Sequence, residues 1–163
     1  MKKLFIFFLA CWLSACGFHL RGMGQSTIKF KNVYVEGASG SLRDQFDEQL
    51  KISSAKLIND PKGADLHVKV TNEQFQSRTV SLGFSGRSNE FELNYRLEFQ
   101  LAGSNNAFLP ADKPLEITRA YFNDQQDILA KNNEEQVIRR EMYQQAVRSI
   151  LDRASAQIHA SAK

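Results

Sequence analysis

The sequence predicts an α+β fold. We expect a two-layer sandwich in which two helices cover one face of a roughly four-stranded, mainly antiparallel sheet, in the order β-α-β-β-β-α. The clearest observation is a strict alternation of apolar odd and polar even positions over residues 91–101. Only a strand with one solvated face fits it, because successive side chains of a strand point to opposite sides. The second observation is a helical period of apolar residues from Glu134 onward. The apolar side of the strand should face the helices.

The first third of the chain predicts a strand and a helix. Residues 28–36 alternate apolar with polar or β-branched positions, which is typical of a strand. A helix is expected near residues 41–51, with Ser41 as a possible cap and one apolar face made by Leu42, Phe46 and Leu50. Residues 55–58 allow a short strand.

The rest of the chain predicts three consecutive strands and a long helix. Alternating residues at 64–77 indicate the first strand, 91–101 the second and 114–122 the third. Strands that follow one another in this way should pair as an antiparallel meander. No Gly or Pro interrupts residues 126–163, so one helix is expected from about 134 to 157, with a loop before it.

The first residues have the layout of a secretory signal peptide. Lys2 and Lys3 precede an apolar run from Leu4 to Leu13, which is too short to span a bilayer. Leu13-Ser14-Ala15-Cys16 then resembles the bacterial lipobox, in which the Cys sulfur is diacylated and the chain is cut before it. An ordinary signal peptide with a chance cysteine is the alternative. We expect a cleaved signal peptide at 1–15, a lipid-anchored tether at 16–27, a single domain at 28–158 and a flexible tail at 159–163.

Composition narrows the function classes. Without Lys2 and Lys3, 19 of the 21 basic residues remain against 18 acidic ones, so the net charge is +1 and gives no signature of nucleic-acid binding. Cys11 leaves with the signal peptide and Cys16 carries lipid, which leaves no cysteine for a disulfide, a metal site or a nucleophile. Two or more acyl chains hold a protein stably at a membrane.

No enzyme, cofactor or metal is expected. The three histidines, His19, His67 and His159, lie away from other ligand types at metal spacing, and His67 is interpreted as a surface strand residue. The segment at 83–86 lacks the spacing of a nucleophile elbow. Glu134 and Glu135 are explained as acids at a helix start.

Cationic side chains could bind a ligand instead. A cation beside apolar strands suits an amphiphile with a phosphorylated head group, and the candidates are Arg78, Arg87, Arg96 and Lys131. For Arg96, with Glu92 and Glu98 nearby, the alternative is a cross-strand ion pair on a solvated face. Lys131 differs, because a conventional capping loop has no need of a cation near a helix start.

Two stretches resemble the family of LPS-assembly lipoproteins, LptE. Cys16-Gly17-Phe18-His19-Leu20-Arg21 is similar to the family's start. The second stretch is similar to its strand-to-last-helix region nearly position by position, and comprises Arg119-Ala120-Tyr121-Phe122-Asn123-Asp124, Leu129-Ala130-Lys131-Asn132-Asn133-Glu134 and Arg140-Glu141-Met142-Tyr143. Residues 37–110 match in pattern alone.

The resemblance implies a non-catalytic lipoprotein of the Gram-negative outer membrane, facing the periplasm. It implies a heterodimer in which the chain plugs the LptD β-barrel, assists its assembly and binds lipopolysaccharide during export. Lys131 would be one lipopolysaccharide contact, Arg87 near the hairpin tip is a second candidate, and Cys16 would carry the palmitate-type lipid. Gly17 after the cysteine fits sorting to the outer membrane. A stand-alone lipoprotein that carries or shields an amphiphile, and an anchored periplasmic enzyme, are the alternatives.

Overall fold

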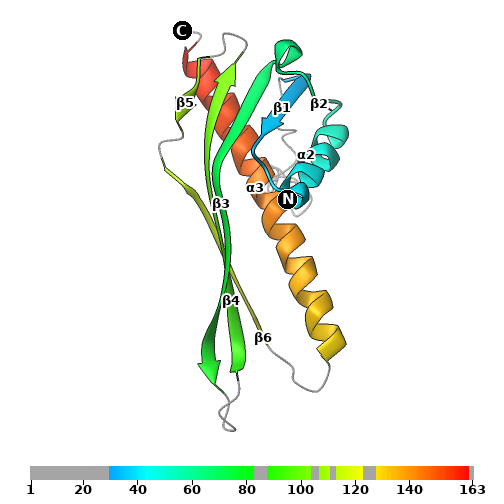
Figure 1. Cartoon of the computed structure of the whole chain (residues 1–163), viewed down its shortest axis with the longest axis vertical. Coiled ribbons are helices and arrows are strands. Elements are labelled where there is room, and N and C mark those ends of the chain that lie inside the picture. Colours follow the sequence, from blue (N-terminus) through cyan, green and yellow to red (C-terminus); the bar gives the residue numbers. More distant parts are fainter. Residues whose placement is uncertain (1–29, 83–87, 104–106, 111–112, 123–127, 162–163) are drawn as a thin grey trace, which may run out of the picture.

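The structure, a computed structural model, describes residues 30–82, 88–103, 107–110, 113–122 and 128–161. These residues form two layers, with a mixed sheet on one side and two helices on the other (Figure 1). The predicted fold class is confirmed. In chain order the elements are β1 (Asn32–Glu36), α2 (Gly40–Ile52), β2 (Lys56–Ile58), a 3₁₀ turn (Pro61–Gly63), β3 (Leu66–Leu82), β4 (Ser88–Gly103), β5 (Leu109–Pro110), β6 (Leu115–Phe122) and α3 (Ile128–Ser161).

The sheet has the order β2-β1-β3-β4, and both β5 and β6 pair with β4. Strands β3, β4 and β6 form the antiparallel meander that the sequence predicts. Strand β1 is parallel to β3, and α2 supplies the crossover that a parallel pair needs. The short strand expected at 55–58 is present as β2, whereas β5 lies in a segment for which no strand was predicted.

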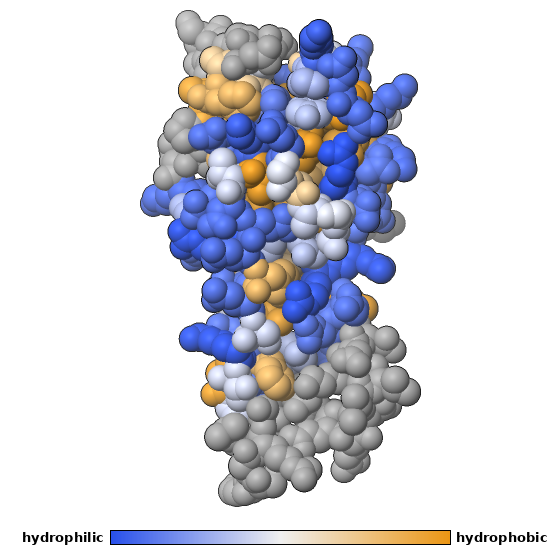
Figure 2. All heavy atoms as spheres, in the orientation of Figure 1, coloured by the Kyte–Doolittle hydropathy of each residue, from blue (hydrophilic) through white to orange (hydrophobic). Residues whose placement is uncertain are grey.

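The core lies between the sheet and the helices. The odd-numbered residues of β4 from Leu93 to Leu101 are buried, as the alternation predicts. They join one cluster with the helical residues Leu42, Phe46, Leu50, Met142, Ala146 and Ile150. On the face shown in Figure 2, apolar residues are visible in the seam between the two layers and hydrophilic residues cover most of the other coloured surface. Each fully buried Leu, Ile, Phe or Met side chain contributes about 1.5–3 kcal/mol to the free energy of folding.

A β-bulge at Thr71 reverses the faces of β3. Val70 pairs with Phe99 and Asn72 pairs with Glu98, so Thr71 is the extra residue on its strand. Before the bulge, the even-numbered Leu66, Val68 and Val70 are buried. After it, odd-numbered residues lie on the helix side, and the even-numbered Asn72, Gln74 and Gln76 lie on the opposite face, which we call the outer face.

The N-cap of α2 is Ser39 and not Ser41, so the helix begins earlier than predicted. The Ser39 hydroxyl accepts a hydrogen bond from the Leu42 amide at 3.3 Å, while its own amide donates to Glu73 at 2.9 Å. Gly37, with φ +77°, turns the chain just before this cap. A Cβ on Gly37 would lie 2.4 Å from the Val70 carbonyl oxygen at the bulge.

Helix α3 begins at Ile128, about six residues before the predicted start. The prediction of a loop around Lys131 is therefore wrong, because Lys131 lies in the first turns of the helix. The loop was expected because the apolar helical period begins only at Glu134. The low helix propensity of Asn132 and Asn133 costs no more than about 0.7 kcal/mol each, and Leu129 and Ala130 favour a helix. The helix also ends later than expected, at Ser161.

Candidate functional site

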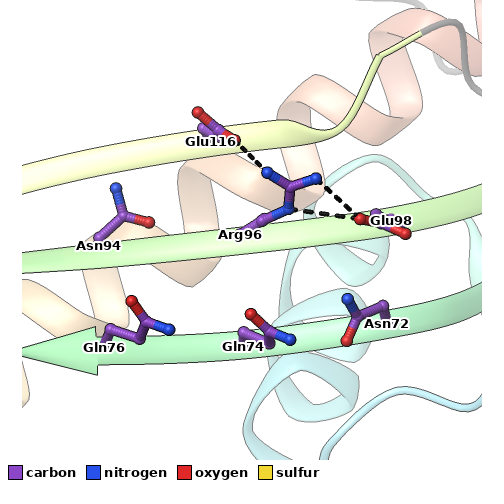
Figure 3. A pocket seen from close by; sticks show the side chains of 7 residues that line it. All are labelled: Asn72, Gln74, Gln76, Asn94, Arg96, Glu98 and Glu116. Atoms are coloured by element: carbon purple, nitrogen blue, oxygen red, sulfur yellow. Dashed lines mark hydrogen bonds and ion pairs between the residues drawn. The ribbon is translucent and has the colours of Figure 1, made fainter.

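The outer face of the sheet carries an ordered array of polar side chains. Asn72, Gln74 and Gln76 project from β3, and Asn94, Arg96 and Glu98 form the neighbouring row on β4 (Figure 3). Together with Glu116 these side chains line an open hollow of about 510 Å³. The Asn94 amide donates to the Thr118 hydroxyl of β6 at 3.1 Å. The face is open to solvent and rich in amides, which can both donate and accept hydrogen bonds.

Arg96 organises the centre of this array. Its guanidinium donates to Glu116 on β6 at 2.8 Å and to Glu98 on its own strand at 3.0 Å (Figure 3). The ion-pair interpretation of Arg96 is therefore correct, although the cross-strand partner is Glu116 and not Glu92. Glu92 instead pairs with Arg78 at 2.7 Å. Because the Arg96 side chain is 42% exposed, these pairs order the surface more than they stabilise the fold.

Of the predicted site residues, Cys16 and Arg87 lie outside the described residues. Lys131 is in the described part of α3, but its side chain is not. Its position near the helix N-terminus is electrostatically unfavourable for a cation, and the first turn of α3 contains no acidic residue. The structure therefore does not describe the surroundings of these three side chains, and their roles stay predictions.

His67 lies on the outer face but is more enclosed than a surface strand residue. Its ring meets those of Tyr34 and Phe108 edge-on, with centroid distances of 4.7 and 4.8 Å. Its Nε2 is 3.2 Å from a Glu36 carboxylate oxygen. Among the described residues there is no group of three or more His, Cys, Asp or Glu side chains that could hold a metal ion.

Sequence reasoning missed a carboxylate on the helix side of the sheet. Glu73 accepts hydrogen bonds from the Ser39 hydroxyl at 2.7 Å and from the Tyr95 hydroxyl at 3.1 Å. Burial, and then the nearby carboxylate of Glu73, raise the pKa of Tyr95 well above its ordinary value. The same two causes raise the pKa of the half-buried Tyr143. In the sequence, Glu73 is only one more polar residue of an alternating strand. The bulge at Thr71 moves it to the helix side, and the alternation does not reveal that change.

A second network joins β6 to the first half of α3. The Tyr121 hydroxyl donates to Glu135 at 2.9 Å, and Arg139 pairs with the same Glu135 at 2.7 Å. The Arg139 guanidinium lies 3.9 Å from the ring centroid of Phe75, and Tyr121 stacks on Phe91 at 5.6 Å. Burial, and then the hydrogen bond to Glu135, raise the pKa of Tyr121 to about 12. These contacts give part of the family-like stretch a structural role in fixing α3 to the sheet.

The chain is similar in sequence to a known protein family. A family model described as "LptE: Lipopolysaccharide-assembly" matches residues 29–154. "LPS-assembly lipoprotein LptE" of Pectobacterium atrosepticum is 28% identical over 145 residues, covering 85% of this chain and 76% of that protein. The protein with the same name from Photorhabdus laumondii is 25% identical over 140 residues, with the same two coverages. In the described part of the chain, no helix is both long and apolar enough to cross a membrane.

Two solved structures share the fold. The solution NMR structure of lipoprotein B from Nitrosomonas europaea has a TM-score of 0.66 and 29% identity, covering 88% of this chain and 94% of that one. The crystal structure of rare lipoprotein B from Shewanella oneidensis has a TM-score of 0.63 and 25% identity, covering 80% and 98% respectively. Because the family model spans most of the sequence, this chain belongs to the LptE family of lipopolysaccharide-assembly lipoproteins.

Proposed function

We propose that this protein is an outer-membrane lipoprotein, acylated at Cys16, that forms a heterodimer with the LptD β-barrel. In this role it plugs and assists assembly of the barrel and contacts lipopolysaccharide during export, without catalysing a reaction. The observation that carries the proposal is the outer face of the sheet. Neither of the two described helices covers this face, and the side chains that line its hollow are amides and ion pairs.

Such a face suits the inside of a barrel. The lumen of an outer-membrane barrel is polar, so a plug must offer it hydrogen-bonding side chains and not an apolar surface. Strands β3 and β4 have 17 and 16 residues. At about 3.3 Å per residue they extend over roughly 50 Å. This exceeds the apolar band of an outer-membrane barrel, about 25 Å tall, so the polar rows can follow a barrel wall while one end of the sheet lies outside it.

Copurification tests the proposal. A tagged wild-type protein should recover a large β-barrel partner, and Arg96→Glu should reduce the recovery at least tenfold because it places a third carboxylate beside Glu98 and Glu116. Arg148→Glu, on the exposed side of α3, is the matched charge reversal. A wild-type protein that never recovers a barrel contradicts the function. A barrel recovered equally with Arg96→Glu and wild type contradicts the outer face as the contact.

Cys16→Ala is expected to abolish incorporation of labelled palmitate. Without the thiol there is no acceptor for the diacyl group, so the chain should keep residues 1–15, which intact mass would show. Cys11→Ala is the control, because Cys11 lies inside the predicted signal peptide. Normal labelling of Cys16→Ala would exclude this cysteine as the anchor.

Lys131→Asp is expected to weaken lipopolysaccharide binding at least tenfold while barrel recovery is retained. An acidic residue in the first turns of α3 complements the helix dipole by about 0.3–1 kcal/mol, so unfolding of the helix cannot account for the loss. Lys62→Asp, at an exposed turn lysine, is the control. Arg87→Asp should show a smaller decrease. Unchanged binding by Lys131→Asp, measured on immobilised lipopolysaccharide, would remove Lys131 from the site.

A further inference from the structure

Exposed apolar side chains gather at one end of the domain. Ile52, Phe108 and Leu109 are 75%, 38% and 41% exposed. Ile52 is the last residue of α2, which leads directly to Lys56, the partner of Asn32 at the start of β1. Phe108 and Leu109 lie at the same end of the sheet, because β5 pairs with the last part of β4. The described chain also begins at this end, at residue 30. We call it the anchored end; in Figure 2 an apolar area is visible there, on the sheet side.

The aromatic part of the anchored end is held in place. The Phe108 ring packs against His67, whose side chain is only 11% exposed, and His67 in turn packs against Tyr34 of β1. Leu109 follows in β5 and pairs with Leu101 of β4. Phe108 and Leu109 therefore form a fixed apolar edge on the sheet.

Basic side chains lie at the same end of the domain as this edge, where Asp60 and Asp65 also lie. The Nζ of Lys69 lies 5.8 Å from the Phe108 ring centroid. It also lies 3.9 Å from a Glu36 carboxylate oxygen, so the positive charge of Lys69 compensates the negative charge of Glu36. Exposed lysines at the same end are Lys31, Lys56 and Lys113. Their location follows from two hydrogen bonds, from the Lys56 amide to the Lys31 carbonyl and from Arg153 near the end of α3 to the Lys113 carbonyl. Exposed aromatic and aliphatic side chains among lysines are typical of a protein surface that lies on anionic lipid.

We propose that the anchored end lies on an anionic phospholipid surface, with Phe108 and Leu109 among the head groups. This inference rests on the proposed Cys16 anchor. The 14 residue steps from Cys16 to Phe30 reach at most about 50 Å, so the lipid alone leaves the domain free to stand away from the leaflet. The apolar edge and its lysines fix both the distance of the domain from the leaflet and its orientation.

A single tryptophan can report this contact. The only tryptophan of the sequence, Trp12, lies in the predicted signal peptide, so Phe108→Trp introduces a unique fluorophore into the mature chain. The purified protein would be mixed with vesicles of phosphatidylcholine and phosphatidylglycerol that carry brominated acyl chains. Emission of Phe108→Trp should shift to the blue and be quenched at least twofold. The effect should be smaller with phosphatidylcholine alone and at high salt.

Val80→Trp is the matched control, because Val80 is 50% exposed but lies near the opposite end of β3. Equal quenching of the two variants, or none in either, would overturn the proposal. A blue shift that appears only with the barrel partner, without quenching by brominated lipid, would also overturn it in favour of a protein contact. Leu109→Trp repeats the measurement if circular dichroism shows that Phe108→Trp does not fold. Copurification and palmitate labelling are independent of this result, so each proposal fails separately.

Discussion

Gly37→Ala is expected to lower the free energy of unfolding by about 2–4 kcal/mol. A left-handed backbone conformation costs an alanine roughly 1–2 kcal/mol, and Gly37 has φ +77°. The added Cβ would also lie 2.4 Å from the Val70 carbonyl oxygen, so the backbone at the bulge must shift, at a cost of about 1–3 kcal/mol. Urea denaturation followed by circular dichroism measures the change.

Gly40→Ala provides the matched control three residues later. Among the described residues, no heavy atom outside its chain neighbours and its own helix backbone lies within 4 Å of an added Cβ, and Gly40 is the first residue of α2. Alanine is favoured over glycine in helices by about 0.5–1 kcal/mol, so this variant should be unchanged or slightly stabilised. If the two variants unfolded at the same urea concentration, the close approach of Gly37 to the bulge would be wrong.

Alkaline pH is expected to unfold the protein steeply above about pH 10. Tyr95 and Tyr121 are held neutral in the folded state, whereas both ionise near their ordinary pKa when the chain unfolds. The unfolded state then binds fewer protons than the folded state, so stability falls as pH rises. With the pKa of Tyr121 at about 12 and that of Tyr95 higher, the free energy of unfolding should fall by about 5 kcal/mol from about pH 9 to about pH 12.

Tyrosinate absorbance and far-ultraviolet circular dichroism would measure this transition together. Tyr95→Phe removes one of the three tyrosines whose pKa is raised in the folded state, so the stability of this variant should decline less steeply with pH. The variant should also be about 1 kcal/mol less stable at neutral pH, because Glu73 loses one hydrogen-bond donor. Parallel pH slopes for Tyr95→Phe and wild type would contradict the role of Tyr95.

The elements that the sequence predicted are those with one continuous periodicity. From Leu93 to Leu101, strand β4 keeps one polar and one apolar face, so the alternation alone predicts the buried side chains of this stretch. Leu42, Phe46 and Leu50 likewise mark one face of α2, and all three are fully buried. In both elements a local pattern and the tertiary packing agree.

The features that the sequence did not predict depend on contacts between distant residues. Thr71 is an extra residue only when β3 is compared with its partner β4. No local sequence pattern therefore reveals that the buried positions of β3 change there from even to odd numbers. Glu73, 34 residues later, accepts a hydrogen bond from the Ser39 amide, and this contact favours Ser39 as the cap of α2. Strand β5 has two residues and no periodicity to detect.

The candidate site was predictable only in part, for related reasons. The polar rows of the outer face follow from alternation along β4, whereas the pairing of Arg96 with Glu116 depends on the register of β6. Cys16, Arg87 and Lys131 were chosen by local motif or by family resemblance. Their roles therefore await the labelling and binding experiments.

The late position of α3 in the chain determines when the core can close. Met142, Ala146 and Ile150, which cover the apolar side of β4, come from the final part of the sequence. A chain that ends before these residues would expose a long sheet with one apolar face, which promotes aggregation. Native packing must therefore await nearly complete synthesis, and premature stop codons in the last helix should yield insoluble fragments, not shortened functional proteins.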